Sequence, residues 1–314
     1  MALEPRISLS LPTFSAEDPG SWDHVVDRAR AADEAGVDQV VVSDHVVFGE
    51  NLEAYARPEL GGSEGGKQPT GPDGHWLEPL TVLTYAAART ERVRLGTNIL
   101  LAALRRPVVL AKTAATIDVL SGGRLDLGVG VGWQREEYEA AGLEFEGRGA
   151  LLDHTLAVCQ ALWTEPRADF DDGRLRFEEI HQMPKPRQPG GVPIWVSGTV
   201  NAAVARRLAR FGAGWIPWGR AAGDLASAIP EMRAAVEAAG RDPAELRVVG
   251  YLPVVRDDDG SVDVKQSMER VPPLVDAGIT DFRAGLPIPG ARDAAAAYLA
   301  DAVGAFRGAV GRTP

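Results

Sequence analysis

The chain has 314 residues, of which 45% are hydrophobic and 25% charged, and its formal net charge is −11. This composition is that of an ordinary globular protein, and the length allows one large α/β domain or two medium ones. The acidic balance argues against nucleic acid or an anionic membrane surface as a partner, and the sequence has no apolar run long enough to span a membrane.

Short apolar runs of β type alternate with amphipathic helical stretches from the beginning of the chain. In the first half, this alternation predicts strands over 6–11, 37–43, 93–101 and 124–130, and helices over 21–36, 78–90 and 106–123. Residues 44–76, with a segment rich in glycine and proline, are predicted to form a long loop after the second strand.

The second half repeats this alternation. A helix is predicted over 149–163, and a β-hairpin within 166–190 has its turn at Asp171-Asp172-Gly173. Strands follow over 192–197, 214–218, 246–252 and 279–285, and helices begin near Asn201 or cover about 222–239, 263–277 and 291–307. Eight strand-plus-helix units without a composition shift predict one (β/α)8 TIM barrel over residues 1–314, with the loop and the hairpin as insertions. A doubly wound open sheet is the alternative, but such sheets usually have fewer strands and often a second domain.

Residues 124–138, RLDLGVGVGWQREEY, place Gly128, Gly130 and Gly132 between a strand and an acidic helix-like stretch. A Rossmann fingerprint needs glycine at its first, third and sixth positions after the first strand, whereas here the sixth position is Trp133 and the strand is the fourth. In a barrel, this stretch lies on the face where active sites form. We therefore expect the glycines to let a flat ring approach the backbone and Trp133 to form a wall of the pocket. Tight barrel packing is the alternative explanation for the glycines.

The single cysteine, Cys159, lies in a predicted helix, which favours a buried thiol and a reducing compartment. The N-terminal residues MALEPRISLSLP lack the basic region and long apolar core of a signal peptide, so we expect a cytoplasmic protein. The histidines and the cysteine show no spacing typical of a metal site, so no metal is expected. The sequence contains neither the GxSxG motif of α/β-hydrolases nor the GxxxxGK[ST] motif of P-loop proteins.

Five segments together resemble a known family. They are LSLPTF near the start, VVVSDHVV at 40–47, VRLGTNILL at 93–101, residues 120–142 and VPIWVSGTVNAAVARRLARFGAGWIP at 192–217. In this order they resemble the bacterial luciferase-like monooxygenase family, and most closely its branch that uses coenzyme F420, a deazaflavin. The resemblance extends from about residue 6 to 290. It implies a TIM barrel that holds FMN or a deazaflavin at the carboxyl ends of its strands.

The resemblance implies roles at the ends of the second and third strands. Asp44 and His45 match a pair beside the reacting ring, where His45, oriented by Asp44, would supply or remove a proton near neutral pH. Thr97, Asn98 and Ile99 match a segment that bulges against the ring through a non-prolyl cis peptide bond. By similarity, that bond would be Asn98-Ile99.

The resemblance also implies cofactor contacts further along the chain. Gly130, Gly132 and Trp133 match the edge of the cofactor pocket at strand four, and Tyr138 matches an aromatic residue near the cofactor's tail. Ser197-Gly198-Thr199 matches the segment that binds the cofactor phosphate. Backbone N–H groups and hydroxyls before a helix suit a phosphate group.

Two positions depart from the sugar-phosphate dehydrogenases of that branch. Gly49 stands where these enzymes have a tryptophan after the Asp-His pair, and Trp133 where they have a glutamate after the glycines. A glucose-6-phosphate substrate is therefore disfavoured, and the long loop 49–76 is expected to shape a different substrate pocket.

The expected function is an F420-dependent oxidoreductase that transfers a hydride between the cofactor and a small organic substrate. One alternative is an FMN-dependent monooxygenase that uses O2 and flavin reduced by a partner reductase, and another is a non-catalytic flavoprotein. The resemblance also allows a homodimer formed through barrel helices.

Overall fold

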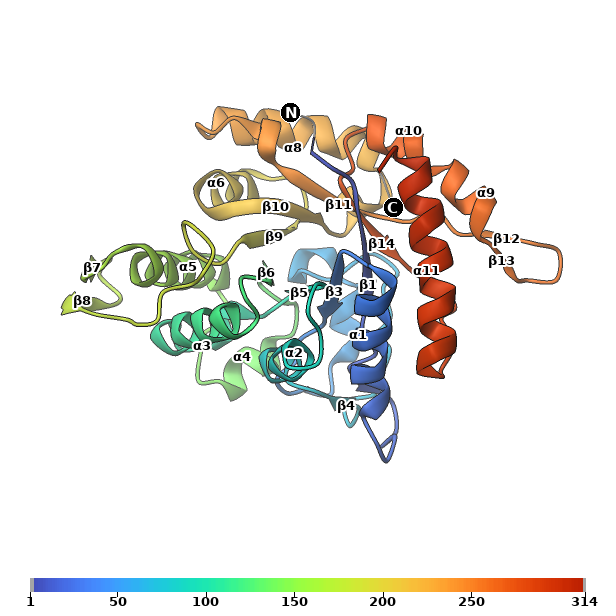
Figure 1. Ribbon diagram of the computed structural model, residues 1–314. Helices are drawn as coiled ribbons and strands as arrows, with labels where there is room; N and C mark the ends of the chain where they lie inside the picture. The colour runs from blue at the N-terminus through green and yellow to red at the C-terminus, as the bar shows by residue number, and fades with distance from the viewer. Residues whose placement is uncertain (1–2, 313–314) are drawn as a thin grey trace.

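Eight parallel strands close into a barrel in the computed structural model, which describes residues 3–312 (Figure 1). In chain order these are β1 (Arg6–Ser10), β3 (Gln39–Val42), β5 (Arg94–Thr97), β6 (Leu125–Val129), β9 (Ile194–Gly198), β10 (Gly212–Pro217), β11 (Arg247–Tyr251) and β14 (Asp281–Ala284). Each strand pairs with its neighbours in this order, and β14 pairs with β1 to complete the ring. The predicted (β/α)8 barrel is confirmed, and the open-sheet alternative is excluded.

Helices cover the outside of the barrel between successive strands (Figure 1). They are α1 (Asp23–Ala35), α2 (Pro79–Ala87), α3 (Pro107–Leu120), α4 (Arg135–Ala140), α5 (Arg148–Thr164), α6 (Ala202–Phe211), α7 (Arg220–Gly223), α8 (Leu225–Ala238), α9 (Val264–Glu269), α10 (Val271–Asp276) and α11 (Arg292–Ala309). The prediction of one continuous helix over 263–277 was wrong, because the structure has two helices there. α9 ends at Glu269, with Arg270 after it, since Pro272 and Pro273 lack the N–H groups that would continue its hydrogen bonds.

Two insertions extend the barrel. The loop after β3 contains the short helices η1 (Leu52–Ala56) and η2 (Pro58–Leu60), and it ends in β4 (His75–Trp76), which pairs with β2 (Phe14–Ser15). Phe14 stacks on Trp76 with 4.3 Å between ring centroids, which anchors the end of this loop. The predicted hairpin before the fifth barrel strand is confirmed as β7 (Ala168–Asp171) and β8 (Arg176–Ile180). A further hairpin, β12 (Val255–Arg256) with β13 (Val262–Asp263), was not predicted.

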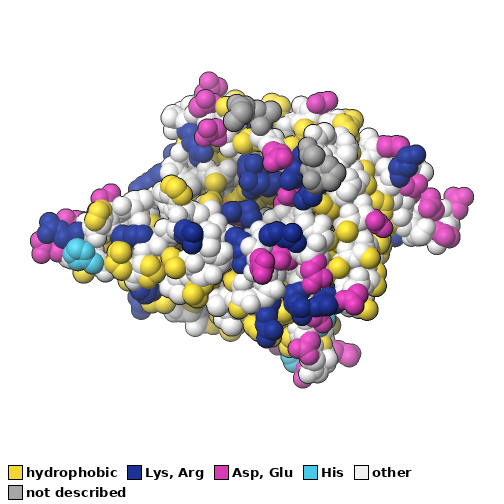
Figure 2. Space-filling model, in the orientation of Figure 1, with side chains coloured by type: hydrophobic (Ala, Val, Ile, Leu, Met, Phe, Trp, Pro, Cys, Tyr) yellow, Lys and Arg dark blue, Asp and Glu magenta, His cyan; other side chains and the backbone are white. Residues whose placement is uncertain are grey.

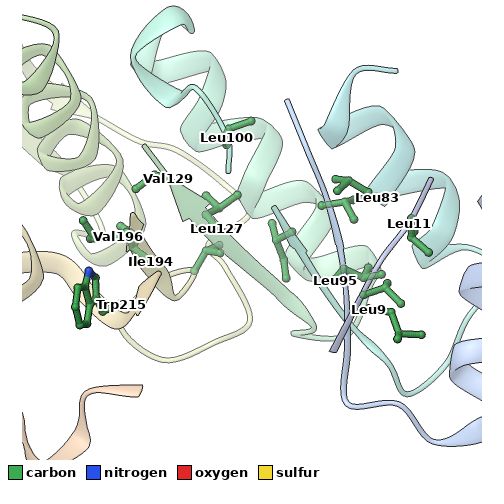
Figure 3. Close-up of a cluster of buried hydrophobic side chains, with 14 of the residues drawn as sticks. Leu9, Leu11, Leu83, Leu95, Leu100, Leu127, Val129, Ile194, Val196 and Trp215 are labelled. Carbon is green, nitrogen blue, oxygen red and sulfur yellow. The ribbon is translucent and has the colours of Figure 1, made fainter. Parts of the chain in front are cut away.

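The main core lies between the strands and the helices (Figure 3). Leu127 and Val129 of β6 lie beside Ile194 and Val196 of β9, and each is at most 1% exposed. These residues are two apart because successive side chains of a strand point to opposite faces. Full burial of such a side chain stabilises the fold by about 1.5–3 kcal/mol.

The alternate residues of the strands point the other way and fill the inside of the barrel. At its amino end, Asp126 pairs with Arg94 at 2.7 Å and accepts a hydrogen bond from Gln39 at 2.8 Å. Towards the carboxyl end, a separate apolar cluster of Trp195, Ile216 and Val249 packs with half-buried Ile99. The barrel therefore has a polar amino end and an apolar floor beneath its opposite mouth.

Side chains of both charges are spread over the face seen in Figure 2, with several Lys and Arg side chains near its middle. Within the described residues, no helix has both the length and the apolar character needed to cross a membrane.

Candidate active site

A pocket of about 540 Å³ opens among the carboxyl ends of the barrel strands. This volume is in the range of sites for organic ligands and cofactors. Eight of the residues singled out from the sequence line the pocket: Asn98, Ile99, Gly130, Gly132, Trp133, Ser197, Gly198 and Thr199. The structure therefore brings the predicted segments from three strand ends, those of β5, β6 and β9, together around one pocket.

Two of the predicted site residues support the pocket wall from behind instead. The hydroxyl of Thr97 is buried and donates to the carbonyl of Gly128 at 2.7 Å. Tyr138 is fully buried, and its hydroxyl donates to the carbonyl of Val131 at 2.6 Å. Burial raises the pKa of Tyr138. Neither residue is among those that line the pocket, so the predicted contact of Tyr138 with a cofactor tail does not fit its position.

Asp44 lies in a buried ion pair. Its carboxylate is 2.6 Å from Nη1 of Arg105 and accepts the backbone N–H of Leu101 at 2.8 Å. Burial raises the pKa of Asp44, and the guanidinium of Arg105 opposes that rise. Arg105 also pairs with Glu78 at 2.9 Å, so this arginine holds the strand ends together rather than facing a ligand.

His45 points to a different partner. Its Nδ1 atom is 3.4 Å from Oε2 of Glu137, whose side chain is 1% exposed. Its Nε2 atom is 3.3 Å from Nε2 of Gln68. The prediction that Asp44 orients this imidazole was therefore wrong, because the Asp44 carboxylate is bound to Arg105 and Glu137 lies beside the ring.

Aromatic side chains surround His45. Its ring centroid is 4.3 Å from that of Phe48, 4.9 Å from that of Trp76 and 5.9 Å from that of Trp133. Trp133 lines the pocket, whereas His45 is not among the lining residues. The imidazole therefore lies one side chain behind the pocket wall.

The beginning of α4 fixes the segment that carries His45. Oε1 of Glu137 accepts the N–H of Val46 at 2.6 Å, and the fully buried Gln134 exchanges two hydrogen bonds with the backbone of Gly49. Sequence reasoning did not identify these two side chains. The available signal was the polar stretch QREE directly after the glycines.

The glycines after β6 make room for the neighbouring strand end. A Cβ atom on Gly128 would overlap the carbonyl of Thr97, and one on Gly130 would lie 2.8 Å from Ile99. A Cβ on Gly132, where φ is +69°, would lie 2.8 Å from Leu101. Packing against residues 97–101 thus requires glycine here, as the alternative explanation held, and because Gly130 and Gly132 also line the pocket, the expected approach of a ring to them stays a prediction.

The peptide bond Asn98-Ile99 is cis, as the resemblance implied. The backbone around it is held by neighbouring strands, because the N–H of Asn98 donates to Val42 and that of Leu100 donates to Gly128, each at 2.7 Å. Asn98 and Ile99 both line the pocket. This segment therefore presents a fixed surface to whatever the pocket binds.

Cationic groups gather at the outer end of the pocket. Ser197-Gly198-Thr199 precedes α6, where Asn201 caps the helix by accepting the N–H of Val204 at 2.9 Å. Arg148, Arg207 and Arg220 line the same pocket, against one lining carboxylate, that of Glu59. Helix N-termini and guanidinium groups bind phosphate and carboxylate groups. Sequence reasoning did not identify these arginines.

Two of these arginines are held in place by other groups. Arg207 is 4% exposed, and its Nε is 2.5 Å from Asp153. Arg148 donates to the carbonyls of Gly132 at 3.3 Å and Leu60 at 2.8 Å. Because their side chains are fixed before any ligand arrives, their binding costs little conformational entropy.

The long loop 49–76 after β3, called the rim loop below, covers part of the pocket. Nε1 of Trp218 donates to the carbonyls of Gly61 and Gly62 at 2.9 and 3.1 Å, and Arg148 holds Leu60 as described above. The rings of Tyr55 and Trp218 are 6.0 Å apart. These contacts fasten the middle of the rim loop to the barrel.

Replacing Trp218 by phenylalanine is expected to loosen this loop, because phenylalanine keeps an aromatic ring but has no N–H to donate. Limited proteolysis should then cut within residues 49–76 faster than in the wild type, with the barrel intact by circular dichroism. Trp22, away from the pocket, provides the control Trp22→Phe, which should leave the cleavage rate unchanged. Equal cleavage in both variants would contradict the fastening role.

No group of three or more His, Cys, Asp or Glu side chains is placed to hold a metal ion in the part of the chain that the structure describes.

The sequence matches the family model described as luciferase-like monooxygenase over residues 6–276, which is most of the chain. The chain belongs to this luciferase-like monooxygenase family. It is 30% identical over 254 residues to the F420-dependent glucose-6-phosphate dehydrogenase of Kineococcus radiotolerans, an alignment that covers 79% of this chain and 65% of that protein.

Solved structures with low sequence identity show the same fold. An F420-dependent secondary alcohol dehydrogenase, in complex with an F420-acetone adduct, superimposes with a TM-score of 0.74 at 18% identity, over 97% of this chain and 100% of that one. The monooxygenase RslO1 from Streptomyces bottropensis gives 0.70 at 22% identity, over 95% and 98% of the two chains. The fold is thus confirmed, and the family and its relatives identify an oxidoreductase.

Proposed function

We propose that the protein is a coenzyme F420-dependent oxidoreductase that transfers a hydride between the deazaflavin and a small organic substrate. The observation that carries this proposal is the cationic outer end of the pocket, with Arg148, Arg207 and Arg220 beside the N-terminus of α6. FMN offers one phosphate to such a surface, whereas the F420 tail adds carboxylates to its phosphate. The relationship to an F420-dependent enzyme supports the same choice.

The pocket residues divide between positioning and proton handling. Asn98, Ile99 and Gly130 would support a flat ring, and Ser197-Gly198-Thr199 would bind the phosphate before α6. The deazaflavin, when bound, would supply the hydride chemistry. The fastened rim loop would exclude water from the pocket.

His45 is the proposed proton donor or acceptor. Nδ1 lies 3.4 Å from the Glu137 carboxylate without a hydrogen bond between them, and Nε2 lies 3.3 Å from the Gln68 amide nitrogen. In the tautomer that carries its proton on Nδ1, Nε2 is the atom that can take up a proton. Gln68 donates to this atom from the rim loop, so movement of the loop would expose Nε2 to a substrate. Asp44 contributes by holding the strand ends rather than by touching the imidazole.

Cofactor choice is tested by titrating the purified apoprotein with F420 and, separately, with FMN, using the fluorescence of Trp133 and Trp218, which both line the pocket. We expect F420 to bind at least about tenfold more tightly, a difference of about 1.4 kcal/mol. The variant Arg220→Met should weaken F420 binding more than FMN binding. Tight FMN binding without F420 binding would instead identify an FMN-dependent monooxygenase, the alternative supported by the similarity to RslO1. Cofactor binding without turnover in a screen of alcohols, ketones and enones would identify a non-catalytic flavoprotein.

A further inference from the structure

A small side chamber of about 20 Å³ adjoins the main pocket near the carboxyl ends of β10, β11 and β14. Asn98, Ile216, Pro217 and Tyr251 line both the chamber and the pocket, so the two are contiguous. A water molecule needs roughly 10–15 Å³ measured in this way. The chamber therefore has room for one small polar group that enters from the pocket.

Arg283 of β14 lines this chamber and is 6% exposed. Its Nε donates to the hydroxyl of Ser8 at 3.0 Å, and that hydroxyl donates to the carbonyl of Phe282 at 3.3 Å. Its Nη1 is buried without a hydrogen-bond partner. Asp281, two residues earlier on the same strand, pairs with Arg247 instead at 3.3 Å.

A buried cation that lacks a paired anion destabilises a folded protein, so such groups are rare without a use. Burial lowers the pKa of Arg283 to about 10, which still leaves the side chain protonated at neutral pH. The guanidinium is thus a fixed positive charge with unused donor capacity in a chamber whose other walls are mostly apolar, with Asn98 and Tyr251 as the polar side chains among them.

Building on the function proposed above, we propose that this chamber binds the carboxylate of an organic acid substrate, with the guanidinium of Arg283 donating to a carboxylate oxygen and the apolar body of the substrate in the main pocket. A carboxylate neutralises the buried charge, which a neutral carbonyl cannot do. A phosphate group, with four oxygens, is larger than a carboxylate, so a chamber of about 20 Å³ favours the carboxylate. The side chamber thus selects small organic acids over neutral ketones and sugar phosphates.

The test compares acids with neutral isosteres of the same shape. Isovalerate and 4-methyl-2-oxopentanoate, each paired with its amide, are titrated into the apoprotein and the F420-loaded protein by calorimetry. We expect each acid to bind at least about tenfold more tightly than its amide, as for a charge-assisted hydrogen bond in a buried site. Equal affinity of acid and amide, absence of binding by both included, would overturn the proposal.

Variants test whether Arg283 causes the preference for acids over amides. Arg283→Met should remove this preference, and Arg283→Lys, which keeps the charge, should retain it in part. Arg206→Met is the matched control, because it removes an exposed arginine of α6 that is not among the residues lining the chamber or the pocket, and it should leave the preference for acids intact. Retention of the preference in Arg283→Met would overturn the proposal.

Stability gives an independent readout. Since Arg283→Met removes an uncompensated buried charge, its thermal unfolding midpoint should equal or exceed that of the wild type. A lower midpoint would assign Arg283 to the stability of the barrel and overturn the proposal. Acid binding to the apoprotein without binding of F420 would contradict the proposed function and leave this site standing. F420 binding and turnover without any preference for acids would support the proposed function and overturn the proposed acid site.

Discussion

Replacing Asp44 by asparagine is expected to lower the free energy of unfolding by about 3 kcal/mol, the lower end of the effect of breaking a buried ion pair. The substitution preserves an acceptor for the N–H of Leu101 but leaves the charge of Arg105, whose side chain is 17% exposed, with Glu78 as its remaining partner. Urea denaturation measures this change as a shift of the midpoint at constant slope.

The chain offers a matched control for this prediction. Glu78→Gln removes the other carboxylate from the same guanidinium, but the side chain of Glu78 is 45% exposed, so the expected loss is below about 1 kcal/mol. Glutamine also preserves the acceptor for the N–H of Thr81 at the start of α2. Equal losses in both variants would contradict the structural role of Asp44. Lost turnover in Asp44→Asn at unchanged stability would restore the catalytic role that the sequence predicted.

Replacing His45 by alanine is expected to reduce turnover by about 10²–10⁴-fold, the usual contribution of a positioned acid or base, while leaving F420 affinity nearly unchanged. The affinity is preserved because His45 lies behind Trp133 and is not among the residues that line the pocket. Steady-state kinetics with a substrate from the screen, combined with cofactor titration, measures both quantities. The exposed His24 provides the control His24→Ala, which should retain full turnover. Retained turnover in His45→Ala would remove the catalytic assignment.

The partner of His45 gives a second readout. Glu137→Gln retains an acceptor for the N–H of Val46 but removes the negative charge 3.4 Å from Nδ1. If Glu137 positions the imidazole, the variant should reduce turnover while F420 affinity and the urea midpoint stay nearly unchanged, whereas a purely structural role would lower the midpoint as well.

Much of the barrel could be predicted from the sequence because its signals are local. Apolar runs such as VDQVVVS (37–43) predict strands covered on both faces, and the eight units predict closure. The split at Arg270 could not be placed by periodicity alone, since hydrophobic spacing continues through it, although Pro272 and Pro273 carried the signal. Short strands such as β12 and β13, of two residues each, leave no periodicity to read.

The sequence predicted which segments meet at the site, but the predicted pairing of Asp44 with His45 was wrong. Residues at strand ends must meet at one barrel mouth, so their convergence follows from the fold. Asp44 and His45 are adjacent, however, and successive side chains after a strand point in opposite directions, which sends one to Arg105 and the other to Glu137. Arg283 gave no signal, because an arginine near a strand end is common and only the structure shows that its Nη1 has no partner.

The rim loop is attached to the barrel at both of its ends. Its first end, directly after β3, is bound to Glu137 and Gln134, and its second end is β4, which pairs with β2. Between these two attachments, residues 51–74 are held to the barrel through the backbone carbonyls of Leu60, Gly61 and Gly62, which accept from Arg148 and Trp218. A stretch from another family member that keeps carbonyls at these places can therefore replace it while the eight strands stay undisturbed. The protein therefore offers a natural cassette for redesign, in which new substrate ranges can be installed by transplanting one surface segment.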